Sequence, residues 1–191
     1  MKAKKLLIMT CLLVLSLSGC SSASKIDSIN REETYESGMA ALALVVESMD
    51  ELYDLAEAVV EVDITNTVYG ELEDVYVYTS STAQVTAAYK GELSAGDVIT
   101  IFEGGGVMDG VEVYYGGVPT LKVGQHLLLF LVDSGRGNSL EYCIVGAYQG
   151  KFIQREGYYF QQATESVKLT ADEYYPQDEE GMQRLLTSLE D

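Results

Sequence analysis

The chain contains few cysteines, few prolines, few basic residues and no tryptophan. Its three cysteines do not suggest a disulfide framework, because two lie at the N-terminal apolar end and only Cys143 lies in the body of the chain. The 12 basic residues face 30 acidic ones, which gives a formal net charge of −18 at pH 7. A chain of this charge repels phosphate backbones, so we expect a well-solvated surface and no nucleic acid partner.

Histidine is also scarce, since His126 is the only one. A lone histidine supplies neither a metal-binding cluster nor a Ser-His-Asp set, so we assign it a structural or surface role. Cys143 lies in a run of alternating residue types, where a free cysteine usually packs as a small apolar side chain. We therefore expect no catalytic residue, no cofactor and no metal, and we do not expect an enzyme.

The N-terminus has the order of residues found in a secretory signal. Three lysines within residues 1–5 precede an apolar stretch at residues 6–17, and small residues follow it. The stretch is shorter than the roughly 20 residues that a transmembrane helix needs, so we expect the signal to be removed.

Leu17, Ser18, Gly19 and Cys20 resemble the lipobox of bacterial lipoprotein precursors. The resemblance implies that Cys20 carries a diacylglyceryl group with fatty acids such as palmitate, and that it becomes the first residue. Two acyl chains hold a protein stably at the cell membrane, here facing outside the cytoplasm. The alternative is an ordinary signal peptide in which the cysteine is coincidental. Removing residues 1–19 removes three lysines and no acid, so the formal charge becomes −21.

We divide the chain into a signal peptide (1–19), a flexible, lipid-anchored tether (20–39) and a single domain (40–191). The apolar run 40–47 fits either a strand or a helix. Ser48 and Glu51 have capping-box spacing and predict a short helix. Its apolar stripe consists of Met49, Leu52, Tyr53, Leu55 and Ala56.

From residue 58 the pattern is that of β-strands. Val60, Val62 and Ile64 alternate with Glu61, Asp63 and Thr65, which predicts one buried side and one side in water. Further short strands are predicted at residues 75–78, 83–89, 97–103, 111–115, 126–132, 141–147, 151–154, 158–161 and 166–169. Glycine-rich turns separate them, which indicates a mainly β sandwich or barrel, followed by a C-terminal helix at about residues 178–189.

Residues 127–132 are six consecutive apolar residues. Such a strand must be covered on both faces in a soluble domain. We expect the barrel interior on one face and, on the other, the helix after Ser48 or the C-terminal helix.

Four motifs occur in an order that resembles the netrin-like, or tissue-inhibitor-of-metalloproteinase-like, β-barrel family. They are YKGEL (89–93), GDVITI (96–101), GG (104–105) and LKVGQHLLLFL (121–131). The resemblance covers residues 57–160 and implies an OB-type barrel, closed or partly open, with flanking helices. In the animal inhibitors of this family a disulfide-bonded N-terminal cysteine chelates the zinc of the target. Cys20 is instead expected to be lipidated and has no disulfide partner, so that activity is not implied here.

The candidate binding residues lie in or beside the loop-rich segment 104–120. They are Glu103, Asp109, Tyr114 and Tyr115. Loops at a barrel rim often carry function, and exposed tyrosines anchor protein or glycan partners. The glycine-rich loop lacks the lysine and hydroxyl residue of a phosphate loop. A weak calcium site at its acids remains open, although their spacing is not that of an EF-hand.

The sequence therefore predicts a membrane-anchored, non-enzymatic binding or interaction module whose protein or glycan partner is unknown. Two alternatives remain. One is an envelope hydrolase in which Glu103 and Asp109 form an acid/base pair. The other is an assembly factor for a neighbouring envelope complex.

Overall fold

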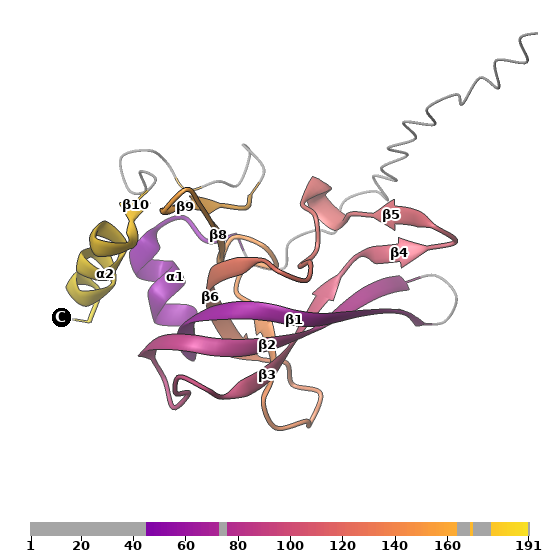
Figure 1. Ribbon diagram of the computed structural model, residues 1–191, viewed down its shortest axis with the longest axis horizontal. Coiled ribbons are helices and arrows are strands. Elements are labelled where there is room, and N and C mark those ends of the chain that lie inside the picture. The colour runs from indigo at the N-terminus through magenta and orange to yellow at the C-terminus, as the bar shows by residue number, and fades with distance from the viewer. Residues whose placement is uncertain (1–44, 73–75, 164–168, 170–176, 191) are drawn as a thin grey trace, which may run out of the picture. The chain divides into compact units, whose positions relative to one another are not determined.

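The computed structural model of the chain describes residues 45–72, 76–163, 169 and 177–190 (Figure 1). The expected signal and tether lie outside these residues, as do residues 40–44 and most of the strand expected at 166–169. The helices are α1 (Met49–Leu55) and α2 (Glu179–Ser188). The strands are β1 (Ala58–Leu72), β2 (Tyr76–Lys90), β3 (Val98–Gly104), β4 (Gly106–Met108), β5 (Val111–Val113), β6 (His126–Asp133), β7 (Glu141–Ile144), β8 (Lys151–Arg155), β9 (Tyr158–Gln161) and β10 (Gln177–Asp178).

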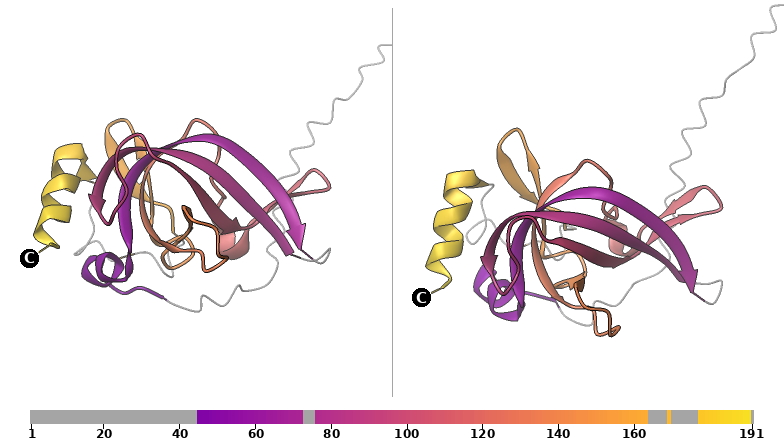
Figure 2. Two further views of the ribbon diagram at one scale, coloured as in Figure 1. Left: turned by 90° about the horizontal axis from the view of Figure 1, so that it is seen from below. Right: turned by 60° about the horizontal axis from the view of Figure 1, so that its bottom comes forward.

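Five strands close a ring in the order β1-β2-β3-β7-β6 and back to β1. β3 and β7 run parallel, and the other neighbours in the ring are antiparallel. β8, β9 and β10 continue the sheet outward from β6, and β4 and β5 form a separate hairpin. Figure 2 shows how β1, β2 and β3 curve together around the ring. The protein is therefore mainly β, with a barrel-like sheet and two helices, as predicted.

Aliphatic side chains from all five ring strands fill the interior of the barrel. β1 contributes Val60, Val62 and Ile64, which confirms the buried side expected from their alternation. β6 contributes Leu127, Leu129 and Leu131, which are at most 1% exposed. The register places these leucines on the closing strand, opposite residues 58–62 of β1.

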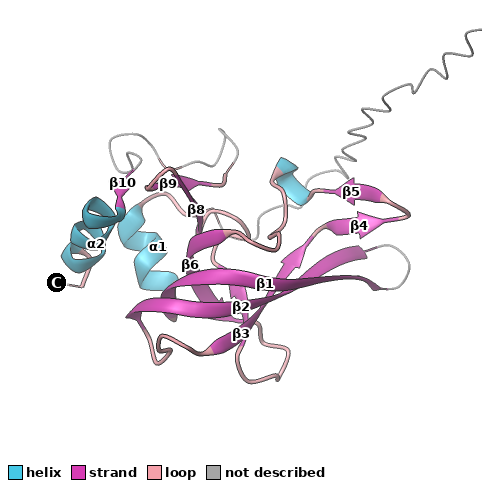
Figure 3. Ribbon diagram, viewed as in Figure 1, coloured by secondary structure: helices cyan, strands magenta, loops and turns pink. Residues whose placement is uncertain are grey.

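The outer face of β6 packs against both helices. Leu128 and Phe130 lie in one apolar cluster with Leu52 of α1 and Met182 of α2. The expectation that residues 127–132 are covered on both faces is thus confirmed, and both helices contribute to the cover. Figure 3 shows the two helices at the same end of the sheet, with β4 and β5 toward the other end.

α1 begins at the predicted N-cap residue, Ser48, and one of the two hydrogen bonds of the capping box is formed. The hydroxyl of Ser48 accepts a hydrogen bond from the N–H of Glu51, and the Glu51 carboxylate accepts one from the N–H of Glu47. Met49, Leu52 and Tyr53 are buried, but Leu55 is exposed because it lies at the edge of the apolar stripe. The described part of the undecided apolar run, residues 45–47, is neither strand nor helix.

The first two strands are longer than predicted. The sequence indicated separate strands at 75–78 and 83–89, whereas β2 is continuous through the polar residues Thr79, Ser80, Ser81 and Thr82. Two of these hydroxyl side chains are buried, where Thr79 donates to the carbonyl of Gly105 and Ser81 contacts the hydroxyl of Thr67. Because these partners satisfy the hydroxyl groups, a polar run remains part of the sheet.

Past the segment that pairs with β6, β1 continues beside β2, and β2 pairs with β3 on its other side over residues 78–84. We call residues 66–72 of β1 and 76–82 of β2 the arm. Two further differences from the prediction lie next to it. Residues 106–108 form β4 rather than a loop, and the strand expected at 111–115 ends at Val113 and is followed by a 3₁₀ turn (Tyr115–Gly117).

We predict that Leu129→Ala lowers the free energy of unfolding by about 2–5 kcal/mol, because it removes a fully buried side chain from the ring-closing strand. Val98→Ala is the matched control, since Val98 is a strand residue that is 55% exposed. Chemical denaturation measures both. An equal, small effect of the two substitutions would contradict the placement of β6 in the core.

Candidate binding face

Aromatic side chains form a continuous strip on the outer face of β2 and β3. The rings of Tyr78 and Phe102 have centroids 5.0 Å apart. Tyr76 stacks on Tyr115 with centroids 5.2 Å apart and planes 8° from parallel. Arg136 completes the strip, with its guanidinium carbon 4.1 Å from the centroid of the Phe102 ring. We call these five residues the aromatic strip.

Arg136 is held over the ring by its own loop. Its Nε lies 3.0 Å from a carboxylate oxygen of Glu141, and side chains of Ser134 and Asn138 also donate to that carboxylate. Glu141 thus organises the loop between β6 and β7. The guanidinium therefore shields part of Phe102 while remaining 41% exposed as a side chain.

Two glycines make room for the rings. A Cβ at Gly104 would lie 2.5 Å from the hydroxyl oxygen of Tyr76 and 2.9 Å from the ring of Tyr115. A Cβ at Gly70 of β1 would collide with the ring of Tyr78, which extends from β2 over the neighbouring strand β1. The side chains of the strip lie flat on the sheet because these neighbouring positions carry no side chain.

The strand residues beneath the strip carry no charge on the outer face, which consists of alternate residues 76–88 of β2 and 98–104 of β3. Residues 64–70 and 75–89 contain no Asp, Glu, Lys or Arg, although the chain has 42 such residues in its 191. Tyr76 and Val68 are large apolar side chains that are 41% and 55% exposed. Depletion of charge together with enrichment of tyrosine is the composition of a binding surface.

The predicted binding residues lie in different environments. Glu103, at the end of β3, is buried and receives hydrogen bonds of 2.8 Å from Lys151 Nζ and from the N–H of Leu121. Lys151 is also buried and donates to the carbonyl of Pro119. This buried ion pair ties the segment before β6 to the barrel, so Glu103 is a structural residue and not part of an accessible surface.

Asp109 is exposed at the tip of the β4–β5 hairpin, where it and Gly110 have positive φ values of 51° and 79°. This is the geometry of a two-residue Asp-Gly hairpin turn, which accounts for the aspartate at this position. Tyr114 is half-buried. Tyr115 alone of the four predicted residues belongs to the aromatic strip, and its hydroxyl accepts a hydrogen bond from the N–H of Val77.

The structure does not bring Glu103 and Asp109 together as an acid/base pair, since the first is held inside by Lys151 and the second is at a hairpin tip. Among the residues that the structure describes, no three His, Cys, Asp or Glu side chains are arranged to hold a metal ion. In the same part of the chain, no helix has the length and apolar character needed to cross a bilayer.

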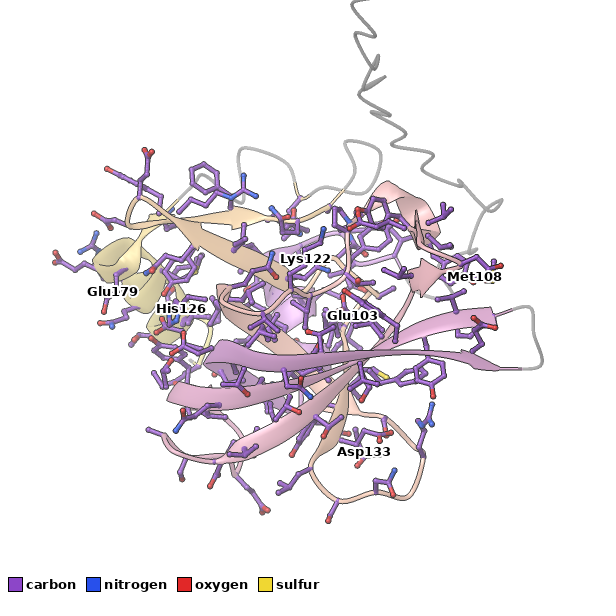
Figure 4. All side chains as sticks on the ribbon, turned by 45° about the vertical axis from the view of Figure 1, so that its right-hand side comes forward. Glu103, Met108, Lys122, His126, Asp133 and Glu179 are labelled. Carbon is purple, nitrogen blue, oxygen red and sulfur yellow. The ribbon has the colours of Figure 1, made fainter. Side chains whose placement is uncertain are left out.

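His126 belongs to a second cluster, on the outer side of the ring near α2. Its Nδ1 lies 2.8 Å from the carboxylate of Asp63, and its Nε2 lies 3.6 Å from the carboxylate of Glu61. Glu61 also accepts hydrogen bonds from the hydroxyls of Tyr89 and Tyr159, at 2.7 and 2.6 Å. Figure 4 shows His126 and Glu179 of α2 toward one end of the molecule and Glu103 well apart from them.

Glu61 is only 8% exposed, which corrects the expectation that it faces water. Tyrosine side chains of β2 and β9 cover this side of β1, a cover that the alternation within β1 does not reveal. Burial raises the pKa of Glu61, but the hydrogen bonds from His126, Tyr159 and Tyr89 together lower it below its usual value. Burial and the Glu61 carboxylate raise the pKa values of both tyrosines.

His126 is flanked by negative charge on both ring nitrogens. The Glu61 carboxylate, with Asp63 in support and against the effect of burial, raises the pKa of His126 to about 9. The imidazole is therefore protonated at neutral pH and is a poor general base. A structural role, as predicted, follows from this geometry, because the cluster joins β1, β2, β6 and β9.

Sequence reasoning did not identify Tyr76, Tyr78, Phe102 or Arg136 as binding residues. The pair Tyr76 and Tyr78 at alternate positions of a strand was the available signal, because alternate residues share one face. Phe102 and Arg136 gave no such signal. The register of β2 with β3 brings Phe102 beside Tyr78, and the loop between β6 and β7 brings Arg136 over Phe102. Cys143 is half-buried in β7, and burial raises the pKa of its thiol.

The structure is that of a mainly β protein with an aromatic outer face on β2 and β3, over which Arg136 lies. Comparison of the chain with protein-family models finds no match, and comparison with curated proteins finds none either.

We predict that the stability contributed by His126 depends on pH. Its pKa of about 9 in the folded state is above the ordinary value of 6.5, so the stabilisation is complete below pH 6.5 and is lost as the pH rises through 9. In wild type, but not in His126→Gln, the free energy of unfolding should therefore fall by an additional ~1–2 kcal/mol between pH 6.5 and 10.

Denaturation at a series of pH values measures this difference. Lys122→Gln is the control, because Lys122 pairs with Glu112 at the surface and both side chains are 46% exposed. It should retain the wild-type profile. Identical profiles for wild type and His126→Gln would show that the cluster does not stabilise the fold.

Proposed function

We propose that the protein is a lipid-anchored, extracytoplasmic binding module that holds its ligand on the aromatic strip of an OB-type barrel. The observation that carries the proposal is the aromatic strip on β2 and β3, whose only charged member is Arg136, in a chain with a net charge of −18. Its location outside the cytoplasm rests on the signal and on the lipobox resemblance that ends at Cys20.

The order of the ring strands supports an OB-type barrel. Numbered along the chain, the five strands β1, β2, β3, β6 and β7 are arranged 1-2-3-5-4, and the third and fifth are parallel. An OB barrel is a five-stranded Greek-key barrel with this arrangement. We infer that the resemblance to the netrin-like family reflects this architecture, with α1 and α2 as the flanking helices.

An OB barrel binds its ligand on the face of its second and third strands and on two flanking loops. In this chain that face is β2 and β3, and one of the two loops joins β6 and β7. Phe102 and Tyr78 lie on the face, and Arg136 reaches it from the loop. The aromatic strip therefore occupies the position in which an OB barrel binds ligands.

The chemistry of the strip favours a neutral ligand. Flat tyrosine and phenylalanine faces bind apolar faces of sugars and of protein side chains. The strong negative charge of the chain disfavours nucleic acid and other polyanions. We propose a neutral glycan or a protein surface as the ligand. In the second case the module serves a neighbouring envelope complex, as in the assembly-factor alternative.

The anchor is tested on the mature protein from its native membrane. We predict that mass spectrometry finds an N-terminal Cys20 carrying a diacylglyceryl group, and that Cys20→Ser leaves the protein unlipidated. An unmodified mature N-terminus in wild type would contradict the anchor, as would a soluble secreted product. Neither result would bear on the binding face.

The binding face is tested with an array of neutral oligosaccharides, followed by calorimetry with each glycan that binds. We predict that Phe102→Ala and Tyr78→Ala each weaken binding by about tenfold, because each removes a stacking surface. Tyr158→Ala is the control, since Tyr158 is 48% exposed but lies in β9.

A protein ligand is tested in parallel with a photo-crosslinking side chain at Ser80, which lies in the described face opposite Phe102. In native cells it should give an adduct that Phe102→Ala abolishes. The binding face would be disproved if no glycan bound and no adduct formed, or if Tyr158→Ala had the same effect as the strip variants.

A further inference from the structure

One edge of β1 has no partner strand in the arm. β6 pairs with β1 at residues 58–63, and the backbone of residues 124–125 bonds to Ile64. From Asn66 to Leu72, β1 pairs with β2 on one side, and no other strand of the described chain pairs with it on the opposite side. This edge is seven residues long, and the strand behind it, β2, pairs in turn with β3 over residues 78–82.

The hydrogen-bonding groups on this edge point outward at alternate residues. The carbonyl of Val77 in β2 accepts a hydrogen bond from Gly105 and is therefore directed away from β1. Facing residues of an antiparallel pair either bond to each other or both point away. Glu71, which faces Val77, therefore presents its N–H and C=O on the free edge, as do Tyr69 and Thr67 two and four residues earlier.

The side chains along the edge do not prevent it from pairing with a strand of another molecule. Sheet edges are usually guarded by lysine, proline or inward-pointing charge. Residues 64–70 contain none of these, and Glu71 is the first charged residue after Asp63. Val68 is 55% exposed and Tyr69 is 42% exposed. The edge thus combines main-chain groups that pair with no strand of the described residues and side chains, both β-branched and aromatic, that favour strand pairing.

We propose that this edge of β1 pairs antiparallel with the same edge of a second copy of the chain, so that the sheets of the two copies join into one continuous sheet. A two-fold symmetric pairing is self-complementary, because each residue i faces residue j of the partner and the reverse. With Tyr69 facing Tyr69, Thr67 faces Glu71. No described acid then faces an acid.

The lack of charge at this edge allows a second copy to approach there. Two chains that each carry a net charge of −18 repel each other over most of their surface. In the arm, residues 66–70 of β1 and 76–82 of β2 include no charged residue. Two copies therefore repel each other least where these segments meet. The pairing leaves the aromatic strip on the face of the sheet, and it does not depend on the ligand of that strip.

The experiment places single cysteines at the edge of the full-length protein in its native membrane. Thr67→Cys, Val68→Cys and Tyr69→Cys are made in a Cys143→Ala background, and Val98→Cys is the control. Val98 and Val68 have the same exposure, 55%, but Val98 lies on β3. Directly opposed residues of an antiparallel pair have Cβ atoms about 4.5–5.5 Å apart, close enough for a disulfide to form.

After mild oxidation, non-reducing electrophoresis measures the disulfide-linked dimer. We expect dimer at one or two of positions 67–69, and at least about fivefold less for Val98→Cys, since only opposed residues meet. In the cysteine variant that crosslinks best, a lysine at a neighbouring edge position should abolish the dimer, whereas Val98→Lys should not. The lysine is Val68→Lys, or Tyr69→Lys where the cysteine is at position 68. Equal crosslinking at all four positions would overturn the proposal, as would its absence at all three edge positions.

Discussion

The barrel depends on the pairing of β1 with β6, which closes the ring. This contact brings Ala58 opposite Leu131 and Asp63 opposite His126, so strands that are distant in sequence meet along six residues. The inner leucines of β6 fill the barrel and its outer residues hold α1 and α2. The same contact places His126 between the carboxylates of Asp63 and Glu61. The closure of the ring, the packing of both helices and the cluster around His126 therefore all depend on this one strand pairing.

Two buried carboxylates of the barrel are stabilised in different ways. Glu103 and Lys151 form an ion pair inside the fold and bind the segment before β6. Glu61 is satisfied by two tyrosine hydroxyls and by the histidine at the boundary with solvent. Both carboxylates are used by the fold, whereas the rings of Tyr76 and Tyr78, which lie in the arm, stack on the outer face of the sheet.

Much of the fold could be predicted from the sequence, because periodicity reports burial directly. The alternation at Val60–Ile64, the continuous apolar run of β6 and the capping box at Ser48 each determine a local environment. The candidate site was less predictable, because the register between paired strands, and not a pattern within one strand, brings its residues together. Phe102 and Tyr78 meet through the pairing of β2 with β3, and Glu61 is buried by side chains from other strands. No pattern within one segment encodes such contacts.

The central claim is that the outer face of β2 and β3 is the binding surface in the cell. Oxidative footprinting by mass spectrometry tests it most directly, by comparing the protein in its native membrane with the same protein purified in detergent. The account predicts protection of Tyr76, Tyr78 and Phe102 in the membrane, with unchanged oxidation of Tyr158 and Phe160, which are 48% and 38% exposed in β9. Equal oxidation of the strip in both samples, or protection confined to β9, would contradict it.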